Sequence, residues 1–467
     1  MVEMGTKTHQ TSEDGTIDER FRGRISRPGD ARYEEDRIVW NGMRDAHPDI
    51  IARCSGVGDV KEAVEFARET DIPVAVRGGG HNVAGTAVRD GGLVIDLSEM
   101  RSVTVDPEHR RVRAQGGATW ADVDWETQAF GLVAPGGVVS ETGIAGLTLG
   151  GGYGWTRRKL GLTCDSLVSA DVITGEGAFV HASEGEHEDL LWALRGGGSG
   201  VGVVTSFEYE CLRLGPEVFF LGALYPLDDG EAVLSAWREF MTDAPDEITV
   251  DALIWSVPPD PMFPEELHGT PFISVVGMYA GPPERGPEAM QPLREIGTPL
   301  LDLSGPMPYL QVQSMLDAAF PDGDRYYWKS HYLAAFGDDE TETILDFARR
   351  RPSPRTLVPI RSLGGEIARV GSDETAFGDR SAAALLSIDG TWEDPADDAE
   401  NVAWVREFWD ATKEYSTGAT YVNFSMLEGD EASRTSFTAN EERLAAVKER
   451  YDPDGVFAPV ETVTVTE

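Results

Sequence analysis

Three glycine triplets fall within the first two hundred residues, at positions 78–80, 150–152 and 196–198. A glycine in regular structure costs roughly 0.5–1 kcal/mol relative to alanine, so repeated triplets indicate positive φ angles or a close approach to the backbone. Consecutive free N–H groups in such loops form concavities that bind anions. The triplets therefore predict a pyrophosphate site, although each one alone is also typical of an ordinary tight turn.

Other nucleotide and metal motifs are missing from the sequence. The chain has no G-x-G-x-x-G opening a βαβ unit and no G-x-x-x-x-G-K-[ST], which disfavours NAD and ATP. The three cysteines, Cys54, Cys164 and Cys211, have no metal-binding spacing, and the eight histidines are scattered. We expect no metal site and a reducing compartment.

The first triplet lies in the hexapeptide RGGGHN at 77–82, and further blocks follow it in order. These blocks are DGGLVIDL at 90–97, QGGA at 115–118, GIAGLTLGGGYG at 143–154, WALRGGG at 192–198 and YVNF at 421–424. Together they resemble the FAD-linked oxidases of the vanillyl-alcohol oxidase superfamily, in particular the berberine-bridge-enzyme-like branch. The matches run from Trp40 to Phe457.

The resemblance implies an α+β protein with a two-domain PCMH-type FAD-binding fold and an antiparallel-sheet substrate domain. It implies an FAD-binding part at 31–213, a substrate domain at 214–417 and a segment at 418–467 that completes the FAD domain. A disordered lead-in is expected at 1–30. The composition agrees, because the triplets stop near Leu214 and prolines and aromatic residues become denser after it.

His81 is implied to bond covalently to the 8α-methyl group of FAD. The structural alternative is a loop histidine that caps a backbone carbonyl. Some relatives carry a second bond from a cysteine, but the matching position here falls at about Val139, and Cys164 suits a small packing thiol. A single covalent bond is therefore expected. The implied cofactor-binding residues are Arg77, Gly78, Gly79, Gly80, His81, Asn82, Gly85, Gly116, Gly137, Thr142, Gly143, Gly146, Gly150, Gly151, Tyr153, Gly154 and Asn423.

Two side chains are candidates for catalysis. Tyr421 belongs to the Tyr-x-Asn segment that borders the active site in the family, as base or as orienter. A tyrosine near pKa 10 needs a lowered pKa to act as a base, and a core aromatic is the alternative. Lys329 is one of only six lysines, and it could line the cleft and stabilise an anion or lie at the surface with its ammonium in water.

Several family positions differ in this chain. Asp165-Ser166 stands where Asp-Asn is frequent, and residues 199–202 replace a frequent Asn-Phe. Residues 458–461 replace the family's closing Asn-Gln-Asn segment. The last change puts contacts at one flavin edge in doubt.

The implied activity is an FAD-dependent oxidase. Hydride would pass from a small alcohol, sugar or amine to flavin N5, and dioxygen would reoxidise the flavin to give hydrogen peroxide. Two alternatives stay open: a dehydrogenase that uses another electron acceptor, and a flavin- or nucleotide-binding protein without turnover. A monomer and a homo-oligomer both fit.

The chain is strongly acidic, with 81 acidic and 40 basic residues and a net charge of −41. This charge excludes nucleic acid and anionic membranes as partners. Because the acidic residues are spread along the chain, they are typical of a halophile's surface, and an acidic docking face is the alternative. No 18-residue apolar window occurs and the start of the chain lacks an apolar signal region, so we expect a cytoplasmic protein.

The elements that must position these residues follow from hydrophobic periodicity. Helices are predicted at 59–69, with Asp59 as N-cap, and at 121–130, 341–349 and 440–450. Strands are predicted at 73–76, 92–97, 168–174, 179–182, 272–278 and 382–388, and a hairpin at 103–106 and 111–115. The strand at 73–76 leads directly into the first glycine loop.

Overall fold

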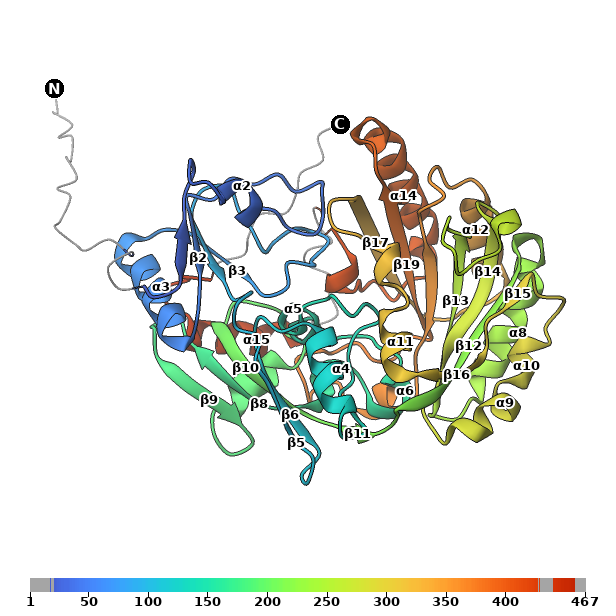
Figure 1. Cartoon of the computed structure of the whole chain (residues 1–467), viewed down its shortest axis with the longest axis horizontal. Coiled ribbons are helices and arrows are strands. Elements are labelled where there is room, and N and C mark those ends of the chain that lie inside the picture. Colours follow the sequence, from blue (N-terminus) through green and yellow to red (C-terminus); the bar gives the residue numbers. More distant parts are fainter. Residues whose placement is uncertain (1–16, 18–20, 427, 429–439, 458–467) are drawn as a thin grey trace.

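The computed structural model describes residues 17, 21–426, 428 and 440–457, which form two halves side by side (Figure 1). The first half contains most of the chain up to about residue 213 together with the C-terminal helix. The second half contains one large sheet and its helices. The lead-in predicted at 1–30 is only partly within the described residues, and its described part includes strand β1 (Arg24–Ser26), which pairs with β2 (Ile50–Arg53).

A small four-stranded sheet carries the first glycine loop. Its order is β1-β2-β4-β3, with β3 at Val74–Arg77 and β4 at Leu93–Asp96. Strands β2 and β3 both run parallel to β4, and helix α3 (Val57–Thr70) makes the crossover between them. Short helix α2 (Tyr33–Asp36) follows β1. The loop after β3 therefore leaves the carboxyl edge of a buried parallel pair.

A second sheet in this half is antiparallel, in the order β5-β6-β10-β8-β9. Its strands are β5 (Val103–Asp106), β6 (Arg111–Gln115), β8 (Leu167–Ile173), β9 (Phe179–Ser183) and β10 (Val203–Glu210). Strands β7 (Leu132–Val133) and β11 (Leu212–Arg213) form a separate pair. The helices of this half are α4 (Trp120–Gln128), α5 (Ile144–Leu149), α6 (Arg157–Leu160), α7 (Glu188–Leu194) and α15 (Glu441–Tyr451).

The C-terminal helix α15 returns to the first half. Leu444, Val447 and Tyr451 of this helix belong to the same hydrophobic cluster as β8, β10 and α7. The Tyr451 hydroxyl donates to Asp189 of α7 over 2.9 Å. Residues far apart in the sequence therefore share one core.

The second half is built on a large antiparallel sheet in the order β15-β12-β14-β13-β18-β19-β17, with β16 also paired to β12. Its strands are β12 (Glu217–Pro226), β13 (Ile248–Ser256), β14 (Pro271–Tyr279), β15 (Leu301–Asp302), β16 (Gly305–Pro308), β17 (Arg325–Leu333), β18 (Val358–Ser362) and β19 (Ala384–Trp392). The helices are α8 (Gly230–Thr242), α9 (Gly286–Ala289), α10 (Gln291–Arg294), α11 (Tyr309–Ser314), α12 (Asp338–Arg349), α13 (Glu366–Arg369) and α14 (Asp398–Thr412).

The two faces of this sheet have different neighbours. Helices α8, α12 and α14 cover one face and share a core with the alternate residues Ile360, Leu386 and Ile388 (Figure 1). The other face turns toward the first half. There Leu385 packs with Tyr153 and Tyr421 in a smaller cluster. The pleat of β17, β18 and β19 thus sends alternate side chains toward helices or toward the glycine-rich loops.

Most predicted elements lie within a few residues of the observed ones, and the hairpin at β5 and β6 has the predicted bounds. The expected N-cap at Asp59 is wrong, because Gly56 is the N-cap of α3. The Asp59 carboxylate instead accepts hydrogen bonds from the backbone N–H groups of Arg22 and Ser55, at 2.8 and 2.9 Å. Within the described ranges, no helix is long and apolar enough to cross a membrane.

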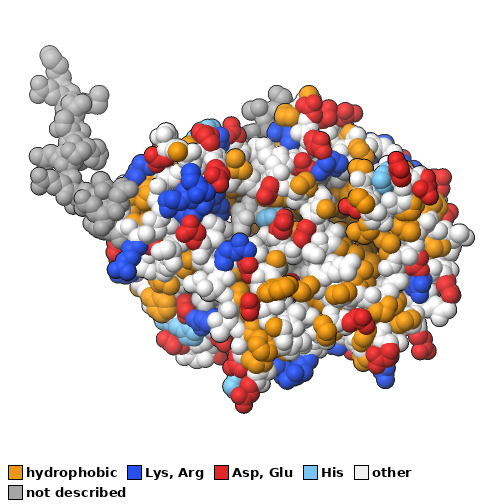
Figure 2. All heavy atoms as spheres, viewed as in Figure 1, with side chains coloured by type: hydrophobic (Ala, Val, Ile, Leu, Met, Phe, Trp, Pro, Cys, Tyr) orange, Lys and Arg blue, Asp and Glu red, His pale blue; other side chains and the backbone are white. Residues whose placement is uncertain are grey.

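Acidic side chains are scattered over the face seen in Figure 2, between hydrophobic and uncharged areas, and do not gather in one patch. Many of them pair with arginine, as in the exposed pair of Arg369 with Asp246 at 2.6 Å. Exposed pairs of this kind contribute little to stability. On this face the negative charge is therefore spread and not concentrated at one site.

Candidate active site

Three loops that are distant in sequence meet at the first glycine triplet. A Cβ on Gly79 would lie 2.5 Å from the backbone nitrogen of Gly143, and a Cβ on Gly78 would lie 3.0 Å from the carbonyl oxygen of Gly116. Side chains at these points would drive the backbones apart. The glycines of the first triplet therefore let the loop after β3 contact the turn after β6 and the start of α5.

His81 follows this contact and has an apolar neighbour. Its ring is half-buried and stacks on the indole of Trp40, with ring centroids 5.0 Å apart and planes at 17°. Burial lowers the pKa of His81 to about 4. The imidazole is therefore neutral at pH 7, and one ring nitrogen keeps its lone pair.

The other two triplets serve packing inside the protein. A Cβ on Gly150 would lie 2.4 Å from the amide of Asn423, and a Cβ on Gly151 would lie 2.8 Å from Phe377. A Cβ on Gly196 would also meet Phe377, at 2.6 Å. The backbone at these triplets is approached by side chains of the C-terminal half, whereas the first triplet is approached by other backbone loops.

The remaining predicted glycines have individual roles. Gly85 has a φ of +67° and would place a Cβ 2.7 Å from Arg44. A Cβ on Gly154 would lie 1.8 Å from the carbonyl oxygen of Gly136, and one on Gly137 would meet Leu147. These positions fix the chain path around the site.

Arg77 does not direct its charge toward the loop. Its guanidinium is buried and donates to Asp96 at 2.8 Å and to the carbonyl oxygens of Asp36 and Ile38 at 2.6 and 3.1 Å. It braces β3 against β4 and α2. Asn82 accepts a 3.3 Å hydrogen bond from the hydroxyl of Thr86 and so shapes its own turn.

Thr142 and Gly146 lie on the other side of the first triplet. The Thr142 carbonyl accepts the backbone N–H of Trp120 at 3.1 Å, which fixes the turn before α5. Gly146 is exposed, and no atom lies within 4 Å of the position that its Cβ would take. The first turn of α5 therefore presents bare backbone to open space.

Tyr421 lies on the Gly150–Gly152 turn, where the charge of Arg361 lowers its pKa by less than burial raises it. Its hydroxyl accepts hydrogen bonds of 2.9 Å from the backbone N–H of Gly152 and from Nδ2 of Asn423. Burial raises the pKa of Tyr421 above its usual value, and those two hydrogen bonds offset only part of the rise. The ring of Tyr421 packs edge-on against that of Tyr153, with ring centroids 4.8 Å apart. The Tyr153 hydroxyl donates a 3.1 Å hydrogen bond to the hydroxyl of Tyr332. This environment suits an orienting residue better than a base.

We expect Tyr421→Phe to lower the free energy of unfolding by about 1–3 kcal/mol, because it removes the acceptor for two buried donors. The aromatic packing stays, so the fold should persist. Urea unfolding measures the change, with Tyr415→Phe as a control, since its hydroxyl makes a weaker contact with Thr343 at 3.2 Å. Equal effects of the two substitutions would contradict this assignment.

Lys329 points away from these residues. It lies on β17 opposite Ile388, which faces the helices, whereas its neighbour Trp328 faces the first half. Its ammonium lies 4.7 Å from the ring centroid of Trp409 and 3.6 Å from the carboxylate of Glu428. Because the strand pleat separates Lys329 from Tyr421, the prediction that Lys329 lines the cleft is corrected.

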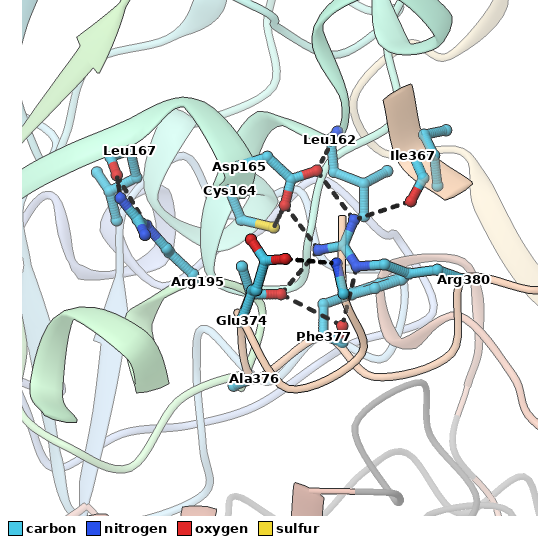
Figure 3. A network of polar contacts seen from close by, with 12 residues as sticks. Leu162, Cys164, Asp165, Leu167, Arg195, Ile367, Glu374, Ala376, Phe377 and Arg380 are labelled. Carbon is cyan, nitrogen blue, oxygen red and sulfur yellow. Dashed lines mark hydrogen bonds and ion pairs between the residues drawn. The ribbon is translucent and has the colours of Figure 1, made fainter. Parts of the chain in front are cut away.

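Cys164 is buried next to an ion pair between the two halves. Arg380 donates to both oxygens of Asp165, at 3.0 and 2.6 Å, and clamps the loop after α13 onto the segment after α6 (Figure 3). The Cys164 thiol lies 3.7 Å from Asp165, and burial raises its pKa well above the usual range. A protonated packing thiol fits this position. Val139 packs against the core of the second half.

Two charged residues that the sequence did not single out lie on the sheet face turned toward the loops. Asp389 of β19 is opposite Trp328, whose ring lies 5.4 Å from that of Trp40. Arg361 of β18 lies over the ring of Phe424, with 4.4 Å between the guanidinium carbon and the ring centroid. A single charged residue within an apolar strand was the available signal, because a buried charge is rare without a role.

Asp389 has an unusual environment. It is 1 % exposed, accepts a hydrogen bond from Ser387, and its Oδ2 has no hydrogen-bond partner among the described residues. Burial raises its pKa to about 6, although Arg361 and Ser387 act in the opposite direction. A carboxylate with such a pKa is suited to exchange protons near neutral pH.

The loops around the first glycine triplet, together with His81, fit FAD. The open space over Gly146 and the joined loops at 78–80 and 142–146 present backbone that a pyrophosphate can approach, although the N–H groups of Thr142 and Ile144 already donate to Val139 and Ala118. The neutral imidazole of His81 offers a nucleophilic nitrogen at the edge of the same loops. Bound there, FAD would supply hydride acceptance, which no side chain can provide.

Known proteins show the same pattern. Residues 48–183 match the FAD binding domain family, and residues 420–459 match the family described as berberine and berberine like. An uncharacterized FAD-linked oxidoreductase of Bacillus subtilis (strain 168), YgaK, is 31% identical over 448 residues, which cover 94% of this chain and 96% of that protein. A chitooligosaccharide oxidase of Gibberella zeae is 26% identical over 456 residues, covering 92% of this chain and 90% of that protein.

Among solved structures, 6-hydroxy-D-nicotine oxidase from Arthrobacter nicotinovorans superposes with a TM-score of 0.84 and 25% identity. The match covers 96% of this chain and 98% of that chain. Sequence relatives and fold therefore agree over nearly the whole chain, and the enzyme uses FAD. The chain belongs to the berberine-bridge-enzyme-like family of FAD-linked oxidoreductases.

Proposed function

We propose that this enzyme is an oxidase that removes a hydride from a small alcohol, sugar or amine and passes the electrons to dioxygen. The observation that carries the proposal is the buried carboxyl group of Asp389, on the sheet face turned toward the His81 loop. One of its oxygens has no hydrogen-bond partner in the part of the chain that the structure describes, and burial raises its pKa to about 6. Hydride loss from such a substrate requires a base for its O–H or N–H proton.

The side chains divide the work in a simple way. Above pH 6 Asp389 takes the proton from the substrate hydroxyl or amine. Trp328 and Phe424, whose ring centroids are 6.0 Å apart, form the apolar side of the site and exclude water. Tyr421 and Asn423 hold the Gly150–Gly152 turn in place. FAD held by the loops at 78–80 and 142–146 would supply hydride acceptance and electron transfer to dioxygen.

Relatives support a small-molecule substrate. One relative is named a chitooligosaccharide oxidase and another a 6-hydroxy-D-nicotine oxidase. These names indicate a sugar substrate for the first and an amine substrate for the second. We further propose that residues 31–213 and 418–467 bind FAD and that residues 214–417 select the substrate. Supporting this division, α15 packs on α7 of the first half, whereas Asp389 and Arg361 come from the large sheet of the second.

A covalent bond from His81 to FAD is part of the proposal, and a second bond is not, because Val139 occupies the matching position. We also propose a cytoplasmic location, because Cys54, Cys164 and Cys211 are all buried free thiols.

The proposal is tested by stopped-flow spectroscopy of the purified holoenzyme. A panel of small alcohols, sugars and amines is mixed anaerobically with the enzyme, and reduction of the flavin band is followed. Reduced enzyme is then mixed with air-saturated buffer. We expect reduction by at least one compound and reoxidation within seconds, with hydrogen peroxide as product. Reoxidation over minutes would indicate a dehydrogenase, and no reduction by any compound would indicate a binding protein.

We also propose that the acidic surface requires salt, as in a halophile. With a net charge of −41, the acidic side chains repel one another in dilute buffer, and salt screens this repulsion. We expect the melting temperature to rise by about 10 °C or more between roughly 0.05 M and roughly 2 M KCl. Differential scanning calorimetry measures the shift. A melting temperature independent of salt would contradict the proposal.

A further inference from the structure

We propose that Arg361 anchors a negatively charged group of the substrate, so that this enzyme oxidises small carboxylates bearing a hydroxyl or an amine. The inference rests on the proposed function, because it names the class of molecule handled at the same site. It is carried by the burial of Arg361, by its unpaired guanidinium and by its place beside the residues around Tyr421.

Arg361 lies on the side of the sheet that faces the site. Leu385, the residue opposite it on β19, packs in one cluster with Tyr153 and Tyr421. The ring of Phe424, over which the guanidinium lies, is 4.8 Å from the ring of Tyr421. The guanidinium therefore borders the group of aromatic residues that holds the Gly150–Gly152 turn.

No carboxylate of the described residues pairs with the guanidinium of Arg361. It is 6 % exposed, and the described part of the chain gives it neither an ion pair nor a hydrogen bond, with Nη1 fully buried and unpartnered. Two other buried arginines differ sharply. Arg157 pairs with Asp251, and Arg380 pairs with Asp165. Arg158, which is also buried, lacks a carboxylate but donates to the carbonyl oxygens of Leu363 and Ala244. Arg361 thus differs from all three arginines, because its guanidinium has no hydrogen-bond acceptor among the described residues.

The nearby acids do not occupy these donors. Asp251 is engaged by Arg157 and accepts the backbone N–H of Ser362 at 3.0 Å. Asp389 accepts a hydrogen bond from Ser387 and lies beyond ion-pair distance of Arg361. Its negative charge nevertheless raises the pKa of Arg361. Burial lowers the pKa of Arg361, and both acids act against this. An arginine stays protonated in such surroundings, so its charge persists.

A buried cation without a partner is unfavourable, and a ligand that supplies the partner gains the energy of a desolvated ion pair. The planar fork of a guanidinium matches the two oxygens of a carboxylate. Along β19, Leu385, Ser387 and Asp389 share one face, so Ser387 lies between the anchor and the proposed base. A substrate that contacts both ends carries its oxidisable hydroxyl or amine a few bonds from its carboxylate.

The test compares acids with their neutral amides on the wild-type holoenzyme in molar KCl, which screens the overall negative charge. The probes are benzoate, lactate and mandelate, each against benzamide, lactamide and mandelamide, and the readout is the anaerobic shift of the flavin absorption band. We expect at least one acid to bind tenfold or more tightly than its amide. This comparison requires no variant and is independent of turnover.

Variants then locate the anchor. We expect Arg361→Gln to abolish the preference for the acid and Arg361→Lys to keep part of it. Arg351→Gln is the matched control and should keep the preference in full, since Arg351 donates to the carbonyl of Ala348 at 2.8 Å on the helix side. Thermal melting of each holoenzyme confirms folding.

The outcomes separate this inference from the proposed function. Equal binding of all acids and amides, or no binding of any acid, would overturn the anchor, even if neutral alcohols or amines reduce the flavin. An unchanged preference in Arg361→Gln would also overturn it, and would leave Arg361 as a reserve partner of Asp389. A preference for acids that is lost in Arg361→Gln supports the anchor, even if no compound is oxidised.

Discussion

His81→Ala is expected to release all of its FAD when the protein is precipitated with acid, whereas the wild-type pellet stays yellow. The reason is that the first glycine loop places one neutral imidazole, with a pKa lowered to about 4 by burial, beside the convergent backbones of Gly79 and Gly143. Its ring nitrogen has a free lone pair at neutral pH. The variant should still bind FAD non-covalently, because the backbone contacts persist, and its flavin midpoint potential should fall.

His109→Ala is the matched control for this experiment. His109 is an exposed histidine at the turn between β5 and β6 and pairs with Asp106 at 2.7 Å. It should keep its flavin through acid precipitation. Acid-stable flavin in His81→Ala would mean that another residue forms the bond.

Asp389→Asn is expected to lower kcat by about 10²–10⁴-fold, the range associated with loss of a general base. In the wild type the activity should rise with pH through about 6, because Asp389 must lose its proton to act and burial raises its pKa to about 6. The variant should show no such step. A pH profile of kcat measures both effects, and a variant with wild-type kcat would remove Asp389 from the reaction.

Asp389→Asn lowers activity but is expected to raise the free energy of unfolding at high pH. A carboxyl group whose pKa is raised in the fold stabilises it below the unfolded pKa, near 4, and this contribution is lost as pH rises through about 6. Asparagine stays neutral. Asp389→Asn should therefore be more stable than wild type at pH 8 by on the order of 2–3 kcal/mol, and the difference should vanish near pH 4.

Asp251→Asn provides the contrast, because Asp251 is paired with the fully buried Arg157. Leaving that arginine unpaired should cost about 3–5 kcal/mol. Urea unfolding of both variants at pH 8 distinguishes the two environments. A loss of stability in both would show that Asp389 is also held by a partner when ionised.

The sequence by itself, through its ordered motifs and the family that they resemble, determined the FAD cofactor and the two-domain α+β fold, and it predicted the loop that carries His81. Glycine triplets in a fixed order are local signals, since each reports a backbone that must turn or be approached closely. Strand and hairpin positions such as Val103–Asp106 followed from the alternation of apolar and polar residues, which is also a property of neighbouring residues in the sequence.

What approaches each triplet was decided only by tertiary structure. Gly78 and Gly79 meet other backbone loops, whereas Gly150 and Gly196 meet Asn423 and Phe377, and nothing in the local sequence distinguishes these cases. Arg77 likewise matched a motif, but its partners Asp96 and Asp36 come from other elements.

Lys329, Asp389 and Arg361 show the same limit for chemistry. Each is a buried charged residue in a strand, and the pleat alone does not say which face meets helices and which meets the site. That choice depends on strand order and register, which are set by contacts between residues distant in the chain: β17 beside β19, and β19 beside β18. The register turns Lys329 toward Trp409 and brings Asp389 and Arg361 to the face turned toward the His81 loop.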